Sequence, residues 1–237
     1  MYRPMMNALL RSLRMLGWAA LTIPLAGCSW GLLRGYAEGP SAVLEGMAAQ
    51  GRPTGATRFA FDELGALNTD ALRTHAIPWK VLVAALLTDR RGSGDTTPLE
   101  ESAVVPVLQE FGFILPNTVL NTGGAPWPGE LTTPLGLLRG NAKRGFPAVE
   151  VELMNLGCAA CHAGVTYDAD GAPRMEVWLG LPNTSLNLNG FTEAVYSAFS
   201  NAMEHPGRLE AALDTLYPGM SQGERSTLER HVLPGLE

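Results

Sequence analysis

Two cysteines and a histidine stand together in the stretch Cys158-Ala159-Ala160-Cys161-His162. On one helical turn, two thiols separated by two residues reach the same edge of a porphyrin and can bond to its two vinyl groups. The adjacent imidazole can then bind the iron axially, and the two alanines are too small to obstruct the ring. The spacing therefore predicts one covalent haem c, held by Cys158 and Cys161, with His162 as the proximal iron ligand.

Three other interpretations of this stretch stay open. A zinc site would use both thiols and the imidazole, but it needs a fourth ligand or a water, and structural zinc sites usually have a second pair of ligands. A thioredoxin-like Cys-x-x-Cys would not need the histidine and would lie near a βαβ pattern, which the sequence lacks. A plain disulfide between Cys158 and Cys161 is the third interpretation, and nothing in the sequence excludes it.

The N-terminus has the pattern of an export signal. Three arginines within the first fourteen residues precede an apolar stretch over 15–26, which is too short to span a bilayer comfortably. The stretch ends in Leu-Ala-Gly before Cys28, which resembles the lipobox of bacterial lipoproteins. This resemblance implies cleavage before Cys28, acylation of Cys28 and a stable bilayer anchor, and Ser29 favours the outer membrane. An ordinary signal peptide with an unrelated cysteine is the alternative.

The two motifs agree on one compartment. The three cysteines divide into one lipid anchor and one haem pair, and c-type haem is attached outside the cytoplasm, so we expect the periplasmic side of a bacterial membrane. Removal of residues 1–27 leaves 14 basic and 23 acidic residues, a net charge of −9. This acidity argues against nucleic acid as a partner and permits docking to a basic redox partner.

Composition divides the chain into a signal peptide over 1–27, a glycine- and proline-rich tether with irregular structure over 28–60, and a haem domain over 61–237. The 210 residues from Cys28 onward are enough for a sizeable core. The abrupt end leaves open whether the domain is truncated. We predict a mainly α, cytochrome c-like haem domain with long loops and at most a small β-hairpin.

Apolar spacing and turn residues place the elements of this domain. The segment 112–146 is rich in turn-forming residues and is expected to be loops over one edge or face of the haem, while Tyr167 to Gly171 is expected to be a hairpin turn. The segment 149–153 is expected to be a short strand or a helix start. Helices are expected over 70–90 with a break at Pro78, from Thr97, after Asn189, from Pro206 and after Ser221.

The residue that faces His162 across the haem decides the chemistry. A methionine or histidine there gives a six-coordinate iron that transfers electrons, whereas an open position allows ligand binding, peroxide chemistry or oxygen activation. Met220 is the main candidate for this distal ligand, because it lies well downstream of the haem motif. The alternatives are Met175, Met203, His205 and His231, each of which has an ordinary structural explanation.

Two further sets of residues are candidate haem neighbours. Arginine and lysine side chains can pair with the propionates, and the turn-rich segment carries Arg139, Lys143 and Arg144. Solvated surface cations are an equally good interpretation of all three. Trp178 is a candidate neighbour of the ring, although packing in an ordinary core is the favoured interpretation.

Three stretches carry a family resemblance: Pro134–Leu137, Leu156–Gly164 and Gly180–Asn183, with Phe191 soon after. Over about 110–237 they resemble the large dihaem cytochromes related to bacterial cytochrome c peroxidases and the rubber oxygenases. The resemblance implies a mostly helical, loop-rich haem domain, His162 as proximal ligand and an exported redox protein. Such proteins carry two haem motifs and this chain has one, which puts peroxidase activity in doubt.

These observations lead to two main hypotheses. The first is a lipid-anchored monohaem c-type cytochrome domain that passes single electrons to or from a redox partner protein. The second is a haem enzyme, or its N-terminal half, that reduces peroxide or activates oxygen at an open iron, with a small-molecule oxidant as its partner. A ligand-binding sensor is a weaker third hypothesis.

Overall fold

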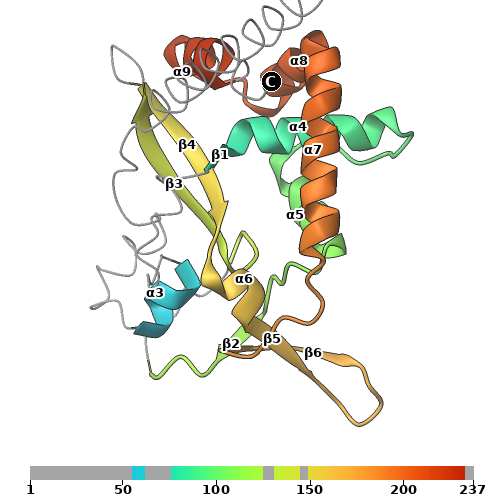
Figure 1. Ribbon diagram of the computed structural model, residues 1–237, viewed down its shortest axis with the longest axis vertical. Helices are drawn as coiled ribbons and strands as arrows, with labels where there is room; N and C mark the ends of the chain where they lie inside the picture. The colour runs from blue at the N-terminus through green and yellow to red at the C-terminus, as the bar shows by residue number, and fades with distance from the viewer. Residues whose placement is uncertain (1–54, 62–75, 125–130, 145–148, 233–237) are drawn as a thin grey trace, which may run out of the picture.

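The computed structural model describes residues 55–61, 76–124, 131–144 and 149–232 (Figure 1). Helices make up 48% and strands 20% of this part of the chain, and the strands form two three-stranded sheets. The prediction of a mainly α domain with at most one hairpin is therefore wrong, because the fold mixes helices and sheets. Cys28 and the predicted signal peptide lie outside the described residues.

The first sheet has the strand order β1-β4-β3 and is antiparallel throughout. It consists of β1 (Ile77–Pro78), β4 (Val149–Leu156) and β3 (Leu137–Arg144). In β4, Val151 and Leu153 are buried and Glu150 is exposed, which is the alternation of a strand with one buried face. The strand interpretation of 149–153 is confirmed, while the loops expected over 112–146 include β3 and one strand of the second sheet.

The second sheet has the order β2-β6-β5. An antiparallel hairpin of β5 (Ala163–Tyr167) and β6 (Pro173–Leu179) pairs with the short parallel strand β2 (Thr118–Leu120). At the hairpin turn, the Asp168 carboxylate accepts hydrogen bonds from the backbone N–H groups of Asp170 and Ala172. The predicted hairpin is confirmed. Asp168 stabilises its turn because the carboxylate bonds to backbone N–H groups a few residues along the chain.

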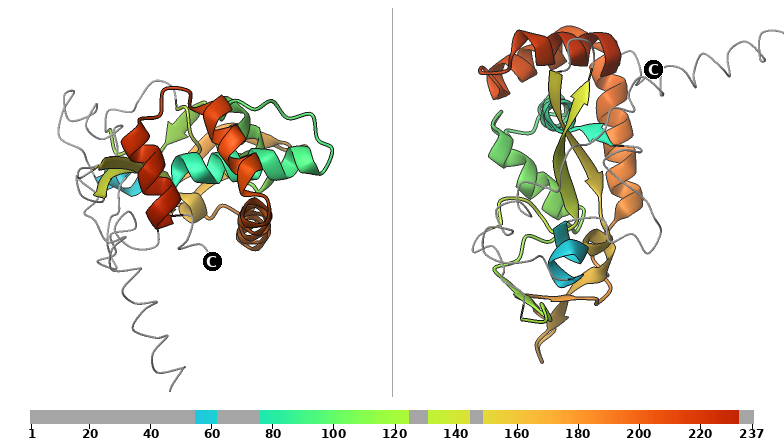
Figure 2. Two further views of the ribbon diagram at one scale, coloured as in Figure 1. Left: turned by 90° about the horizontal axis from the view of Figure 1, so that it is seen from above. Right: turned by 90° about the vertical axis from the view of Figure 1, so that its left-hand side faces the viewer.

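Helix α4 (Trp79–Gly92) begins directly after Pro78, as predicted, and all its residues from 81 to 87 are buried. It is covered by α7 (Leu188–Glu204), which crosses it, and by α8 (Pro206–Leu216) (Figure 2). Helix α7 carries an apolar stripe with four-residue spacing, which is buried at Phe191, Val195 and Phe199. The hydrophobic face of each helix thus forms the main core with the first sheet.

The remaining helices are short. They are α3 (Gly55–Phe61), η1 (Glu101–Ala103), α5 (Val104–Glu110), α6 (Cys158–His162), α9 (Gln222–Thr227) and η2 (Leu228–Val232). The helix expected from Thr97 begins later, at Glu101, and the Ser221 hydroxyl caps α9 as predicted. No helix in the described ranges combines the length and apolar character needed to cross a bilayer.

Candidate haem attachment site

The predicted attachment residues lie on α6, which joins β4 of the first sheet directly to β5 of the second (Figure 1). Cys158, Cys161 and His162 are exposed, whereas Ala159 and Ala160 are only 1% and 2% exposed. Residues three and four apart share one face of a helix, so one turn presents both thiols and the imidazole outward. The two alanines occupy the opposite, buried face.

The alanines attach this turn to two separate cores. Ala160 packs in the main core, whereas Ala159 packs in a second, smaller core with Leu135, Val177 and Leu179. In the sequence argument their small size served to clear the macrocycle. In the structure it has a further effect, because a small buried side chain lets the helix lie close to both cores.

Two glycines bring α6 against the start of β3. A Cβ at Gly136 would lie 1.9 Å from the backbone nitrogen of Ala160, and one at Gly157 would lie 2.9 Å from the Leu138 side chain. Gly157 N–H donates a hydrogen bond of 2.7 Å to Gly136 O. Since Gly136 also has a φ of +77°, both its backbone conformation and the available space require glycine.

The C-terminal end of α6 is held by the loop Gly180–Asn183. Gly180 N–H donates to His162 O at 2.8 Å, and Asn183 N–H donates to Cys161 O at 2.7 Å. The Asn183 amide nitrogen donates to Ala160 O at 3.1 Å. The last carbonyls of a helix have no partner within it, so this loop supplies the hydrogen bonds that the short helix lacks. Sequence reasoning assigned no role to Gly180 or Asn183, and only their place in the resemblance marked them.

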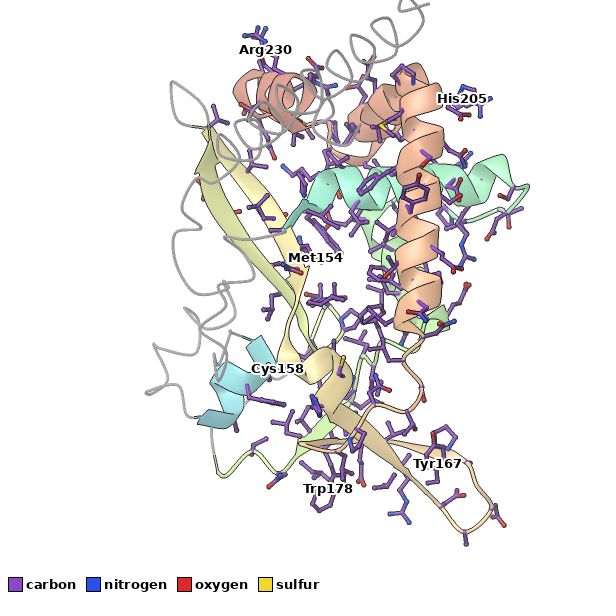
Figure 3. All side chains as sticks on the ribbon, viewed as in Figure 1. Met154, Cys158, Tyr167, Trp178, His205 and Arg230 are labelled. Carbon is purple, nitrogen blue, oxygen red and sulfur yellow. The ribbon has the colours of Figure 1, made fainter. Side chains whose placement is uncertain are left out.

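Two exposed apolar side chains lie on the hairpin and loop that follow the turn. Trp178 is 41% exposed and Leu181 is 39% exposed, so the expectation that Trp178 packs in an ordinary core is wrong. Trp178 pairs with Gly164 in the sheet register, and a Cβ at Gly164 would lie 3.2 Å from the Cβ of Leu181. Figure 3 shows Trp178 on the hairpin that follows Cys158. Large apolar side chains exposed beside an attachment turn suit an apolar ring.

The structure does not bring the main candidate for the distal ligand to this turn. Met220 is half-buried between α8 and α9, where it packs against the main core and donates its N–H to Tyr217 O. These helices lie at the opposite end of the molecule from α6 (Figures 1 and 2). The physical reason is α7, whose 17 residues carry the chain away over about 25 Å.

The alternative distal ligands that the structure describes also lie away from the turn. His205 and Met203 lie at the end of α7 that is remote from Cys158, and Figure 3 labels His205 there. Both side chains are exposed to solvent. The side chains of Met175 and His231 lie outside the described set.

Arg139 has partners other than a propionate. Its guanidinium bonds to Glu152 at 2.8 Å and to Glu101 at 3.0 Å, and it lies 4.3 Å from the centre of the Trp79 ring. The indole of Trp79 donates to the same Glu101 carboxylate at 2.7 Å. The expectation that Arg139 pairs with a propionate is therefore not supported, and the side chains of Lys143 and Arg144 lie outside the described residues.

The arrangement bears on the competing interpretations of the motif. In the described part of the chain, no three histidine, cysteine, aspartate or glutamate side chains converge as metal ligands. Cys158 and Cys161 are separate free thiols on the surface. The two sulfurs and the imidazole thus lie on one exposed face of a turn, which is the arrangement expected for the predicted haem attachment.

The sequence matches no model of a protein family, no curated protein and no solved structure.

Proposed function

We propose that this chain is an exported c-type cytochrome domain that binds one haem covalently and transfers single electrons. The observation that carries the proposal is the outward presentation of Cys158, Cys161 and His162 on a single turn whose two alanines are buried. Such a turn offers its reactive groups to a ligand while its backbone stays attached to both cores. The predicted export signal and lipid anchor at Cys28 complete the proposal and place the domain on the periplasmic side of the membrane.

Each residue of the turn has a distinct role in this proposal. Cys158 and Cys161 would hold the haem covalently, each through a carbon–sulfur bond formed by addition of its S–H across one vinyl group. His162 would hold the iron through a nitrogen of its imidazole ring. When bound, the haem supplies one-electron chemistry by cycling between ferric and ferrous iron. Trp178 and Leu181 provide apolar surface that excludes water from the attachment side.

A second candidate function, a haem enzyme with an open distal position, is favoured by one observation. His205 lies at the end of the molecule remote from Cys158 (Figure 3), the same end of α7 carries Met203, and Met220 lies between α8 and α9. Without a firm sixth ligand, an iron held by His162 would be free to bind peroxide, oxygen or another small ligand. The partner would then be a small-molecule oxidant rather than a redox protein.

The experiment that tests the proposal is expression of the full chain in a bacterium with c-type haem maturation machinery. We expect haem to remain bound after denaturation, and we expect substitution of both Cys158 and Cys161 by alanine to abolish this attachment. The His205→Ala variant is a matched control, since His205 is exposed and lies away from the turn. If the unaltered chain carries no haem after denaturation, the proposal is refuted.

The spectrum of the loaded protein separates the two candidates. A reduced, low-spin spectrum that carbon monoxide does not change indicates two firm protein ligands and supports electron transfer. Ready binding of carbon monoxide indicates an open or labile sixth position and supports the haem enzyme. Substitution of Met220 by alanine should leave the spectrum unchanged, because Met220 lies between α8 and α9, away from the turn.

A further inference from the structure

The backbone of His162 is held on both sides by one loop. The carbonyl before it, Cys161 O, accepts from Asn183 N–H at 2.7 Å, and its own carbonyl accepts from Gly180 N–H at 2.8 Å. These two carbonyls belong to the two peptide planes that flank the His162 Cα. Because a peptide unit is planar, fixing both planes fixes φ and ψ of His162 and hence the direction of its Cα–Cβ bond.

The side chain of Asn183 extends this attachment. Its amide nitrogen donates to Ala160 O at 3.1 Å and to Gly112 O at 2.9 Å, and its carbonyl oxygen accepts from Ser185 N–H at 3.1 Å. The side-chain amide of Asn183 thus links α6 to the loop that follows α5. Both hydrogens of the amide and its oxygen are used, which makes the orientation of this side chain unambiguous.

Gly180 reaches His162 through its backbone conformation. Its φ is +94°, which glycine adopts readily and other residues rarely do. A Cβ added at Gly180 would meet no atom within 4 Å. The requirement for glycine is therefore conformational and not steric, and the positive φ accompanies the N–H that donates to His162 O.

We infer that the loop Gly180–Asn183 positions His162 as an axial ligand, with Asn183 as the positioning residue. This inference rests on the proposed function. The loop leaves only the two side-chain torsions of His162 free, and staggered rotamers restrict them further. Removal of the Asn183 amide would let the end of α6 move, so the imidazole would sample more orientations and hold the iron less firmly.

The test is the displacement of His162 from the ferrous iron by added imidazole in the haem-loaded full chain under saturating carbon monoxide, which occupies the sixth position so that imidazole competes only for the place of His162. In Asn183→Ala we expect half-displacement at about tenfold lower imidazole concentration, a change on the scale of one or two lost hydrogen bonds. Gly180→Ala should act in the same direction. The matched control is Asn189→Ala, because Asn189 is an exposed asparagine on α7.

A second pair of variants, built on His162→Gly, shows whether Asn183 positions His162 or only stabilises the fold. In His162→Gly, imidazole from solution can take the axial place without a link to the backbone. The Asn183→Ala substitution should then leave imidazole affinity unchanged, since no tethered ligand remains to be positioned. If Asn183→Ala lowered the half-saturating imidazole concentration equally in both backgrounds, the inference would be overturned.

Other outcomes are also decisive. If Asn183→Ala retains covalent haem and its melting temperature falls but imidazole displacement stays at the wild-type concentration, the loop has only a structural role and the inference fails. If Asn183→Ala does not fold, Gly180→Ala decides by the same measurement, because it keeps every side chain of the loop. Failure of the unaltered chain to attach haem would refute the proposed function itself, and the inference with it.

Discussion

The Nζ atom of Lys80 lies 2.7 and 2.9 Å from the two carboxylate oxygens of Glu224, which follows it by 144 residues. Glu224 is only 8% exposed, and the pair ties the start of α4 to α9. The Lys80 ammonium also lies 5.4 Å from the centre of the Tyr217 ring. One ion pair therefore holds the last described helices of the chain against the first helix of the main core.

Removal of one partner of this pair should destabilise the fold. We expect Glu224→Ala to lower the free energy of unfolding by about 1–3 kcal/mol, because it leaves the Lys80 charge partly buried without its partner. Urea denaturation measures this change. The control Glu210→Ala, an exposed position on α8, should stay within about 0.5 kcal/mol of the wild type. A Glu224→Ala variant as stable as this control would show that the pair contributes nothing.

The close approach at Gly136 predicts a severe effect of a single methyl group. In Gly136→Ala, the new Cβ would lie 1.9 Å from Ala160 N and the residue would keep a φ of +77°. The helix α6 must then move, so we expect loss of covalent haem attachment along with reduced thermal stability. Gly123→Ala is the matched control, since Gly123 has a φ of +63° with nothing within 4 Å and should cost only about 1 kcal/mol. Normal attachment in Gly136→Ala would contradict the described docking of α6.

Among the residues that the structure describes, the hydroxyl of Tyr217 is buried and has no hydrogen-bond partner. We expect Tyr217→Phe to raise the free energy of unfolding by about 1 kcal/mol, because it removes an unsatisfied polar group. Urea denaturation at neutral pH tests this prediction. Leu216→Ala, next to it on the chain, should instead be destabilising because it removes half-buried apolar surface.

The buried hydroxyl of Tyr217 also predicts that the protein loses stability at alkaline pH. Burial, and then the charge of the nearby Glu101, raise the pKa of Tyr217 above the ordinary tyrosine value of 10.0. The folded protein therefore keeps a proton that the unfolded chain releases, and the resulting stability is present below about pH 10 and is lost as the pH rises above it. We expect the free energy of unfolding to fall less steeply with rising pH in Tyr217→Phe than in the wild type, and urea denaturation at several pH values above 10 measures this. Equal slopes in both proteins would count against a buried, protonated Tyr217.

The exposed imidazole of His162 predicts a change of iron ligation without loss of the haem. In His162→Ala the two thiols remain, so we expect covalent attachment in reduced yield, a high-spin ferrous spectrum and ready binding of carbon monoxide. His205→Ala should match the wild type in yield and spectrum. An unchanged low-spin spectrum in His162→Ala would show that another residue is the proximal ligand.

Local signals allowed several elements to be predicted from the sequence. The hairpin at Asp168, the start of α4 after Pro78 and the Ser221 cap depend on residues close together in the chain, so their chemistry is visible there. The spacing within Cys158–His162 likewise determined which side chains share one face of a turn. These predictions needed no knowledge of the rest of the fold.

Contacts between distant segments were decided only by the tertiary structure. The strand β3 was not predicted, because it lies in a segment rich in glycine and proline. Its pairing depends on the partner strand β4 and not on its own composition. The distance between Met220 and the attachment turn depends on the direction of α7, which no local pattern specifies. The hydrogen bonds of Gly180 and Asn183 to α6 arise in the same way, since backbone carbonyls carry no sequence signal that would identify their partners. The sequence by itself thus determined which reactive side chains share one face of the turn, and the tertiary structure determined what holds that turn in place.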